Sequence, residues 1–149
     1  MILYHFTCEQ HLDRILRDGL TRGDVPTSVT DGRNGVWFTT SPAPQGHGVF
    51  ADGAVSREIR AETAKLIGRV VPEGSKYADK TAARIEVVIS SHDPRLVSWA
   101  KWGRKHCEIS MFSALNRTGP EWKTWFIYFG TIPADRFGSV LLNGKLGGI

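Results

Sequence analysis

The stretch that decides the fold is the first one, Leu3-Tyr4-His5-Phe6-Thr7, which comes directly before an amphipathic segment and a Gly-Leu pair. Apolar residues on both faces of residues 2–6 predict a short strand near the centre of a sheet. His5 lies inside this strand, and a buried imidazole needs a hydrogen-bond partner. We expect that partner to be either neighbouring backbone or a ligand held by the rest of the chain.

A helix is expected to follow the first strand. Thr7 and Gln10 have the spacing of a capping box, in which each side chain bonds the backbone N–H of the other residue. Gly19 stands where a helix C-cap takes a left-handed conformation, and Leu20 is expected to fold back onto the helix. The buried stripe of this helix is predicted to consist of Leu12, Ile15 and Leu16.

The rest of the chain predicts mostly strands separated by irregular loops. Alternation puts Ile85, Val87 and Ile89 on one face of a strand. Asp93-Pro94 is typical of the first two positions of a helix. This order of elements predicts an α+β domain built on a mixed or antiparallel sheet. Strands are expected at residues 35–40, 84–90, 122–130 and 137–142, helices at 55–70 and 94–105, and loops at 21–34 and around Asn116, Gly119 and Pro120.

The composition bounds the class of protein. A chain of 149 residues, 41% of them apolar, is expected to form one domain with its own core. Cys8 and Cys107 lie far apart and lack CxxC spacing, so we expect two reduced thiols rather than a disulfide framework or a zinc site. There is no long apolar run and no signal-peptide pattern, which predicts a cytoplasmic protein without a membrane span.

The charge balance favours polyanionic partners without requiring one. The chain has 19 Lys and Arg residues against 15 Asp and Glu residues, a net charge of +4. The basic residues are scattered except in the segment 101–106, KWGRKH. We interpret this segment as the solvated end of a helix, with contact to nucleic acid or phosphate as the alternative.

Three hydroxyl side chains end the second predicted strand, and His47 and Phe50 follow after a short turn. A slot between this strand and the first one would hold a flat ring, with the hydroxyls and His5 bonding a ribose. Taken singly, His47, His92 and His106 have no evident partners and are expected on the surface or in turns. The three hydroxyl residues are Thr39, Thr40 and Ser41.

The run Tyr4-His5-Phe6-Thr7 and the later Gly19-Leu20 resemble the start of proteins with the ADP-ribosyltransferase fold, whose first strand reads Y-H-x-T before a helix that ends in Gly-Leu. DarT-like DNA ADP-ribosyltransferases and tRNA 2′-phosphotransferases begin in this way. Residues 35–41, GVWFTTS, resemble the G-I-Y-F strand of the poly(ADP-ribose) polymerases. The resemblance implies a split sheet with flanking helices that binds NAD as a substrate.

The resemblance also implies roles for particular residues. His5 would bond a ribose 2′-hydroxyl, Ser41 would match the ribose- or amide-binding hydroxyl, and Phe50 would match the aromatic residue that stacks on nicotinamide. Arg84 would bind the pyrophosphate as a charge-assisted fork, with a salt bridge at the sheet edge as the alternative. The residues implied for NAD binding are His5, Phe6, Thr7, Thr39, Thr40, Ser41, Phe50 and Arg84.

Transfer in that family needs a carboxylate, which bonds the ribose and polarises the acceptor while an oxocarbenium-like state forms. Glu121, just before the strand expected at 122–130, is the candidate, and with His5 it completes the expected catalytic pair. Glu108 is the substitute. The chain departs from the family here, because the family's glutamate usually lies on the strand itself, at the place of Thr124 or Trp125.

Two classes of function remain open. The first is an NAD-dependent ADP-ribosyltransferase that modifies a protein or a nucleic acid, as a toxin or mobile-element effector does. The second is a non-catalytic module of the same fold that binds a nucleotide or a protein. An NAD-dependent RNA 2′-phosphotransferase is a third reading, although the arginine set of those enzymes is not evident in the chain.

Overall fold

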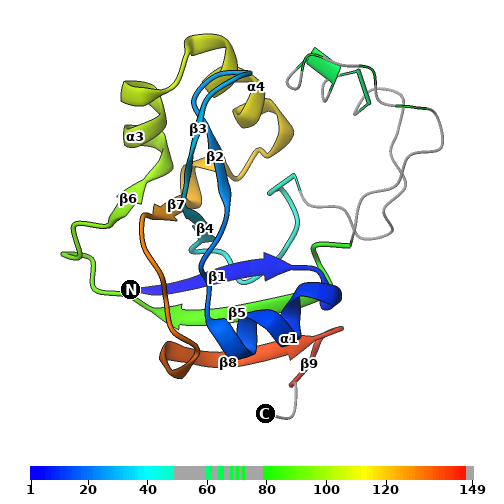
Figure 1. The fold of residues 1–149 in the computed structure, drawn as a ribbon, viewed down its shortest axis with the longest axis vertical. Helices are drawn as coiled ribbons and strands as arrows, with labels where there is room; N and C mark the ends of the chain where they lie inside the picture. Colours follow the sequence, from blue (N-terminus) through cyan, green and yellow to red (C-terminus); the bar gives the residue numbers. More distant parts are fainter. Residues whose placement is uncertain are drawn as a thin grey trace.

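The computed structural model describes residues 1–48, 60–61, 64–65, 68, 70, 72 and 79–146. Within them the chain is α+β, as predicted, and its strands form a seven-stranded sheet in the order β6-β7-β4-β1-β5-β8-β9 and a β2–β3 hairpin (Figure 1). All the strand pairs are antiparallel. The described elements are β1 (Ile2–Thr7), α1 (Glu9–Asp18), β2 (Asp24–Pro26), β3 (Gly32–Asn34), β4 (Val36–Thr39), β5 (Ala83–Val88), β6 (Leu96–Ser98), α3 (Trp99–His106), α4 (Ile109–Thr118), η1 (Trp122–Thr124), β7 (Trp125–Tyr128), η2 (Ala134–Arg136), β8 (Phe137–Leu142) and β9 (Lys145–Leu146).

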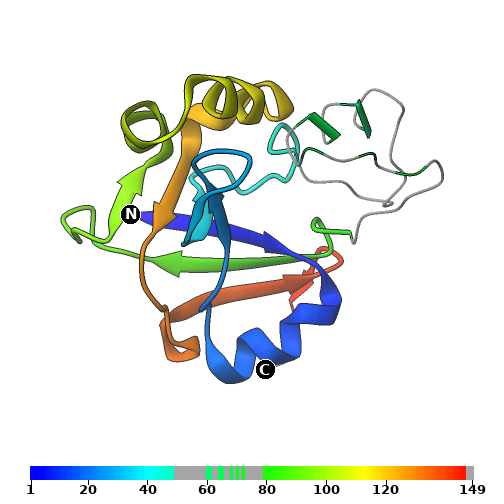
Figure 2. The same ribbon diagram turned by 45° about the horizontal axis from the view of Figure 1, so that its top comes forward.

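Strand β1 lies at the centre of the sheet, as its sequence predicts. It pairs with β5 along its whole length, from Ile2 opposite Val88 to Thr7 opposite Ala83. Its pairing with β4 is limited to Tyr4 opposite Thr39. The sheet is therefore barely joined at this point, and β4 and β7 run across the direction of β1, β5 and β8 (Figure 2).

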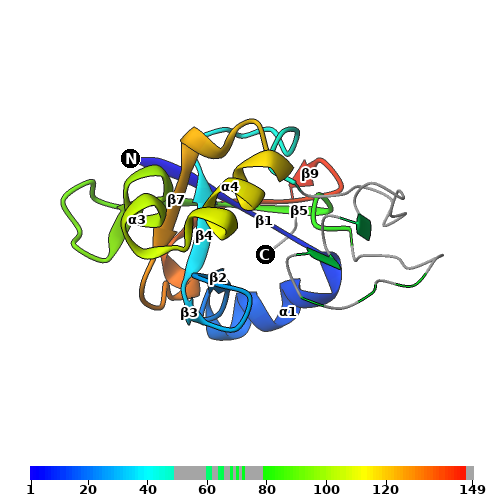
Figure 3. The same cartoon turned by 90° about the horizontal axis from the view of Figure 1, so that it is seen from above.

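Helix α1 covers one face of the β1-β5-β8 part of the sheet (Figure 3). Its buried residues Leu12 and Ile15 join a core with Leu3, Ile85 and Val87. This confirms the buried stripe predicted for the helix and the inward face predicted for the strand at 84–90. The capping-box prediction is wrong, because the N-cap is Cys8 and no side chain bonds it. Thr7 still belongs to the strand at this point, so the helix starts later than the spacing suggested.

The C-terminus of α1 is fixed by Gly19. This residue has φ +84°, which side chains rarely adopt, and its N–H donates to the carbonyl oxygen of Ile15 over 2.8 Å. A Cβ at this position would collide with the carbonyl oxygen of Ile132. Leu20 then pairs with Ile132 in an isolated bridge, so the chain leaves the helix along the sheet.

A second, aromatic core lies under α3 and α4, at the other end of the molecule from α1 and β9 (Figure 1). The helix predicted at 94–105 begins only at Trp99, and β6 precedes it. Asp93 does not cap this helix, because its carboxylate accepts from the backbone N–H and guanidinium of Arg95. The predicted loop is confirmed at Gly119 and Pro120 but wrong at Asn116, which lies in α4 and accepts a 2.8 Å bond from the Trp99 indole.

The loop predicted at 21–34 contains the β2–β3 hairpin. Its strands are only three residues long, too short for a sequence period to show. The indole of Trp37 donates to the Asp24 carbonyl oxygen over 2.8 Å and ties the hairpin to β4. The strand predicted at 122–130 is reduced to β7, with η1 before it. Most of the helix predicted at 55–70 lies outside the described residues.

Candidate functional site

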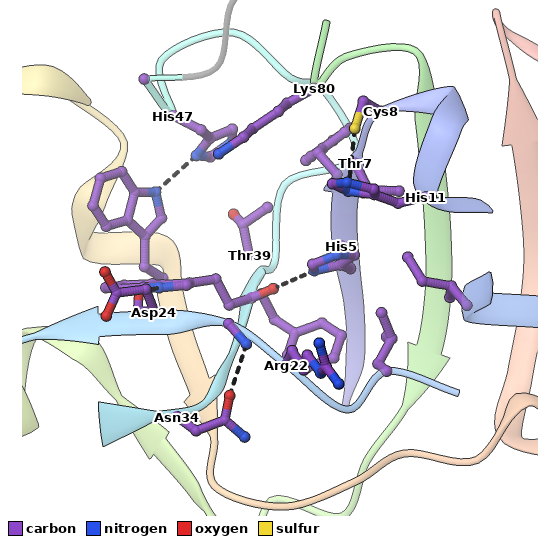
Figure 4. Close-up of a pocket in the computed structure, with 18 of the residues that line it drawn as sticks. His5, Thr7, Cys8, His11, Arg22, Asp24, Asn34, Thr39, His47 and Lys80 are labelled. Atoms are coloured by element: carbon purple, nitrogen blue, oxygen red, sulfur yellow. Dashed lines mark hydrogen bonds between the residues drawn. The ribbon is translucent and has the colours of Figure 1, made fainter. Parts of the chain in front are cut away.

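A pocket of about 1020 Å³ opens where β1 and β4 part (Figure 4). The ends of both strands, the start of α1 and the β2–β3 hairpin form its walls, and the end of α4 and the start of β7 close the far side. Because the sheet is joined there by one residue pair, the edges of β1 and β4 are available to a ligand. Of the residues implied for NAD binding, those that line the pocket are His5, Phe6, Thr7 and Thr39.

The imidazole of His5 is half-buried in the pocket wall and bonded to backbone. Its Nδ1 lies 2.8 Å from the carbonyl oxygen of Trp37, which can only accept, so Nδ1 carries the hydrogen. Burial lowers the pKa of His5, and the positive charge of Lys80 adds to this effect against the opposing bond to Trp37. The ring is therefore neutral at pH 7. Its Nε2 has a free lone pair that no hydrogen bond within the described residues engages.

Cations outnumber carboxylates around the pocket. Arg14, Arg22, Arg33 and Lys80 line it, whereas Asp24 is its lining carboxylate within the described residues. No hydrogen bond or ion pair joins Arg14, Arg22 or Lys80 to another described side chain. The charges of Arg14 and Arg22 do act on Asp18, whose pKa they help to lower, although the Arg17 side chain is its main partner. An excess of cations over carboxylates in the lining of a concave site favours an anionic ligand.

An aromatic wall stands on the side formed by β7. The indole of Trp125 donates to Nδ1 of His47 over 2.8 Å, and the His47 ring stacks on Phe6 with centroids 6.0 Å apart. Burial lowers the pKa of His47, against smaller opposing effects of the Ala43 carbonyl and of Glu121. The sequence predicted only a turn histidine here, because nothing in it links residue 47 to residue 125.

The two glycines that flank His47 explain how the turn presents it. Gly46 and Gly48 have φ values of +81° and +71°, and a Cβ on Gly46 would lie 2.6 Å from Cγ of Glu121. The backbone N–H of Glu121 donates to the carbonyl oxygen of Gly46 over 3.0 Å. The turn is thus held against the start of η1, and His47 is fixed in the pocket wall.

Both cysteines are free thiols. Cys8 lines the pocket, and its Sγ lies 3.2 Å from Nδ1 of His11. Cys107 instead donates to the carbonyl oxygen of Pro26 over 3.4 Å, and burial raises the pKa of its thiol. No group of three or more His, Cys, Asp and Glu side chains suited to a metal ion occurs within the part of the chain that the structure describes.

Of the three hydroxyl residues predicted to bind a ribose, Thr39 lines the pocket, whereas Thr40 and Ser41 do not. Thr39 is buried, its hydroxyl lies 2.7 Å from that of Thr124, and it accepts from the backbone N–H of Ser41. Ser41 bonds the backbone of Ala43, and Thr40 is exposed. The hydroxyls at the end of β4 therefore mainly stabilise its link to η1 and the following turn.

Three further predicted residues are not brought together with His5. Arg84 lies on the other side of the sheet, where it donates to the Pro42 carbonyl oxygen over 2.9 Å and lies over the ring of Tyr4. Glu121 is exposed beside Gly46 and does not line the pocket, and Glu108 is exposed at the start of α4. Phe50 lies outside the described residues.

No protein-family model matches the chain, and comparison with curated proteins and with solved structures gives no significant match. The described residues contain no helix with the length and apolar character needed to cross a membrane.

Proposed function

We propose that the protein is an NAD-dependent ADP-ribosyltransferase that binds NAD in the pocket between β1 and β4. The observation that carries this proposal is His5. Its backbone bond to Trp37 fixes the tautomer, and burial keeps the ring neutral. A neutral imidazole with Nε2 unprotonated accepts a hydrogen bond from a ribose hydroxyl, which a charged ring would not do.

The charges and rings around His5 fit the rest of a dinucleotide. Arg14, Arg22 and Lys80 have no described ion-pair partner and supply positive charge for the pyrophosphate. Phe6 and His47, which stack on each other, both line the pocket and give it aromatic surface that suits a planar base. A pocket of about 1020 Å³ is at the upper end of the range that small-molecule and cofactor sites occupy.

The proposed reaction breaks the bond between the ribose C1′ and the nicotinamide nitrogen, and nicotinamide leaves with the electron pair. A nucleophile of the acceptor then bonds C1′ and gives its proton to a carboxylate. Asp24 lines the pocket and Glu121 stands beside the His47 turn, so these two residues are the candidates for that role.

A non-catalytic nucleotide-binding module is the second candidate, and the position of Glu121 favours it. The carboxylate implied by the resemblance is exposed and outside the pocket lining. The residues that bind a ribose and a pyrophosphate need no such carboxylate. The two functions therefore share a ligand and differ in turnover.

Nicotinamide release from NAD by the purified protein tests the proposal. We expect release by the wild type and its loss in His5→Ala, with His92→Ala as the control because His92 is exposed on the loop after β5. Loss of release in Asp24→Asn or in Glu121→Gln identifies the carboxylate. If NAD raises the melting temperature but neither the wild type nor any variant releases nicotinamide, the second candidate, the non-catalytic nucleotide-binding module, is correct. If NAD does neither, both proposals are wrong.

A further inference from the structure

Cys8 is a pocket side chain that the proposed reaction does not use. It is 4% exposed and lines the pocket, but it belongs to neither hydrophobic cluster of the described residues, whereas Cys107 packs against the aromatic one. Cys8 is also the N-cap of α1, and its side chain makes no capping hydrogen bond. Neither membership of a core nor helix capping, within the part of the chain that the structure describes, accounts for a thiol at this position.

The Cys8 thiol contacts the imidazole of His11, which lies in the first turn of α1. Sγ is 3.2 Å from Nδ1, and Figure 4 shows the pair at the edge of the pocket, on the side of α1. No hydrogen bond within the described residues engages Nε2 of His11, so Nε2 can carry the ring hydrogen while Nδ1 accepts the thiol proton. A thiol beside an imidazole that can take its proton is a common form of activated sulfur nucleophile.

A reagent reaches Cys8 through the pocket, because the rest of the side chain is buried. Cys8, His11 and Arg14 are spaced by three residues and line the pocket from one face of α1. Lys80 lines the pocket as well, whereas none of the carboxylates of α1 does. The positive potential of the lining draws anionic reagents towards the thiol and repels cationic ones.

Cys107 differs from Cys8 in each of these respects. It does not line the pocket, and its thiol donates to the carbonyl oxygen of Pro26 over 3.4 Å. Burial raises the pKa of the Cys107 thiol, which lowers the fraction of the thiolate that attacks electrophiles. Of the two free cysteines, Cys8 is therefore the one placed for reaction, and Cys107 is an internal reference in the same molecule.

We propose that Cys8 is a covalent modification site, at which a small acidic disulfide exchanges with the thiol inside the pocket. Sγ attacks one sulfur of the disulfide, so an Sγ–S bond forms as the S–S bond of the reagent breaks. The leaving sulfur takes the electron pair, and the thiol proton passes to Nδ1 of His11 and from there to the leaving thiolate. Cys8 is thereby oxidised, and the leaving half of the reagent is reduced to a thiol.

An acidic disulfide uses both chemical features of this end of the pocket. Exchange needs the sulfur nucleophile and the neighbouring proton acceptor, and the carboxylate of the attached half is attracted by Arg14 and Lys80, which line the same pocket. Oxidation by a neutral peroxide would use the thiol and the imidazole but not the cations. The two kinds of reagent therefore differ in their dependence on the charge of the pocket.

Exchange rates at the two cysteines, measured by mass spectrometry of peptides from the full chain, test the proposal. The reagents are dithiodipropionate and cystamine, two disulfides of similar size and opposite charge. We expect dithiodipropionate to react about tenfold faster at Cys8 than at Cys107. The preference for dithiodipropionate over cystamine should be about fivefold greater at Cys8 than at Cys107.

Two variants separate the role of the imidazole from that of the charges. His11→Gln should slow exchange at Cys8 about fivefold with both reagents, because the proton acceptor is lost. Arg14→Gln/Lys80→Gln should remove most of the preference for the acidic reagent. The matched control is Lys101→Gln/Arg104→Gln, which removes one exposed lysine and one exposed arginine from α3, outside the pocket lining.

The proposal is overturned if Cys8 reacts no faster than Cys107, or if the two cysteines show the same preference between the two reagents. It is also overturned if His11→Gln leaves the rate at Cys8 unchanged, or if the control pair reduces the charge preference as much as Arg14→Gln/Lys80→Gln does. A reaction of Cys8 with hydrogen peroxide that is faster than its exchange with dithiodipropionate would contradict the choice of reagent.

One consequence rests on the proposed function. An adduct at Cys8 takes up space in the pocket, so dithiodipropionate should inhibit nicotinamide release by the wild type but not by Cys8→Ser. The exchange rates themselves are measured without NAD. Selective exchange at Cys8 without nicotinamide release supports the modification site and contradicts the enzyme, whereas nicotinamide release with equal reactivity of the two cysteines does the reverse.

Discussion

The two cores of the molecule are built from different side chains. The core under α1 is mostly aliphatic, with Leu3, Ile85 and Val87 fully buried, and it fixes the backbone of β1 and hence His5. The core under α3 and α4 is aromatic, with Trp99, Trp102 and Trp125 buried. The pocket is lined by residues of both layers, among them Ile15 and Phe38 from the first core and Trp37 and Trp125 from the second. The candidate site thus depends on how rigidly two different layers are joined.

The largest effect is expected when the aromatic core loses its central ring. Trp99 is fully buried and its indole donates to Asn116, so Trp99→Ala should lower the free energy of unfolding by about 3–5 kcal/mol. Ile85→Val, in the aliphatic core, should cost about 0.5–1.5 kcal/mol. Urea denaturation measures both. Equal losses would contradict the contrast between the two cores.

Gly103 gives a second, smaller test of the aromatic core. A Cβ at this position would lie 2.8 Å from Cδ2 of Phe112 and 2.9 Å from Cζ3 of Trp99. Helix propensity alone would make Gly103→Ala stabilising by about 1 kcal/mol, but overpacking should reverse the sign and lower stability by about 1–3 kcal/mol. Thermal unfolding of this variant beside Lys105→Ala, an exposed site of the same helix, decides the sign. A raised melting temperature would mean that the packing is loose.

The join between the two layers is tested at Thr39. Its hydroxyl lies 2.7 Å from that of Thr124, which in turn donates to the carbonyl oxygen of Glu121, and it accepts from the N–H of Ser41. Thr39→Val should therefore destabilise the protein by about 1–2 kcal/mol. We also expect weaker NAD binding, measured by calorimetry, because the wall of the pocket loosens. Unchanged stability would show that this link does not fix β4.

The smallest effect is electrostatic and is expected at low pH, at Asp93 in the loop before the edge strand β6. The hydrogen bonds from Arg95 lower the pKa of Asp93 from 3.8 to about 2, and the Tyr128 hydroxyl contributes less. A lowered carboxyl pKa stabilises the fold above the unfolded value and loses that contribution as pH falls through the folded value. The melting temperature of the wild type should thus fall between pH 4 and pH 2 more steeply than that of Asp93→Asn. Parallel curves would contradict the assignment.

The elements that the sequence predicts well are those that one short pattern determines. Residues 2–20 carry a strand, a stripe of Leu12, Ile15 and Leu16, and a glycine at positive φ, and all of these are local. The region 94–118 fails because its helix starts depend on distant partners. Asp93 bonds Arg95 instead of capping a helix, β6 forms only by pairing with β7, and Asn116 is held by Trp99.

The candidate site follows the same rule. His5, Phe6, Thr7 and Thr39 are found from two local motifs, and the structure places them around one pocket. The cations Arg14, Arg22 and Lys80, the acid Asp24 and the pair of His47 with Trp125 come from separate elements, and no spacing in the chain links them. Arg84 is the opposite case. Strand alternation correctly predicts that its side chain lies on the face opposite to that of Ile85, but nothing in the sequence says which of the two faces meets the pocket.

The central claim is that neutral His5 presents Nε2 to a dinucleotide in this pocket. The most direct test is ¹⁵N NMR of the histidine rings at pH 7 with and without NAD, assigned with His5→Ala. The account predicts that free His5 is the Nδ1–H tautomer, and that NAD shifts its Nε2 signal while leaving that of exposed His92 unchanged. A protonated His5 ring, or an Nε2 signal that saturating NAD does not move, would contradict it.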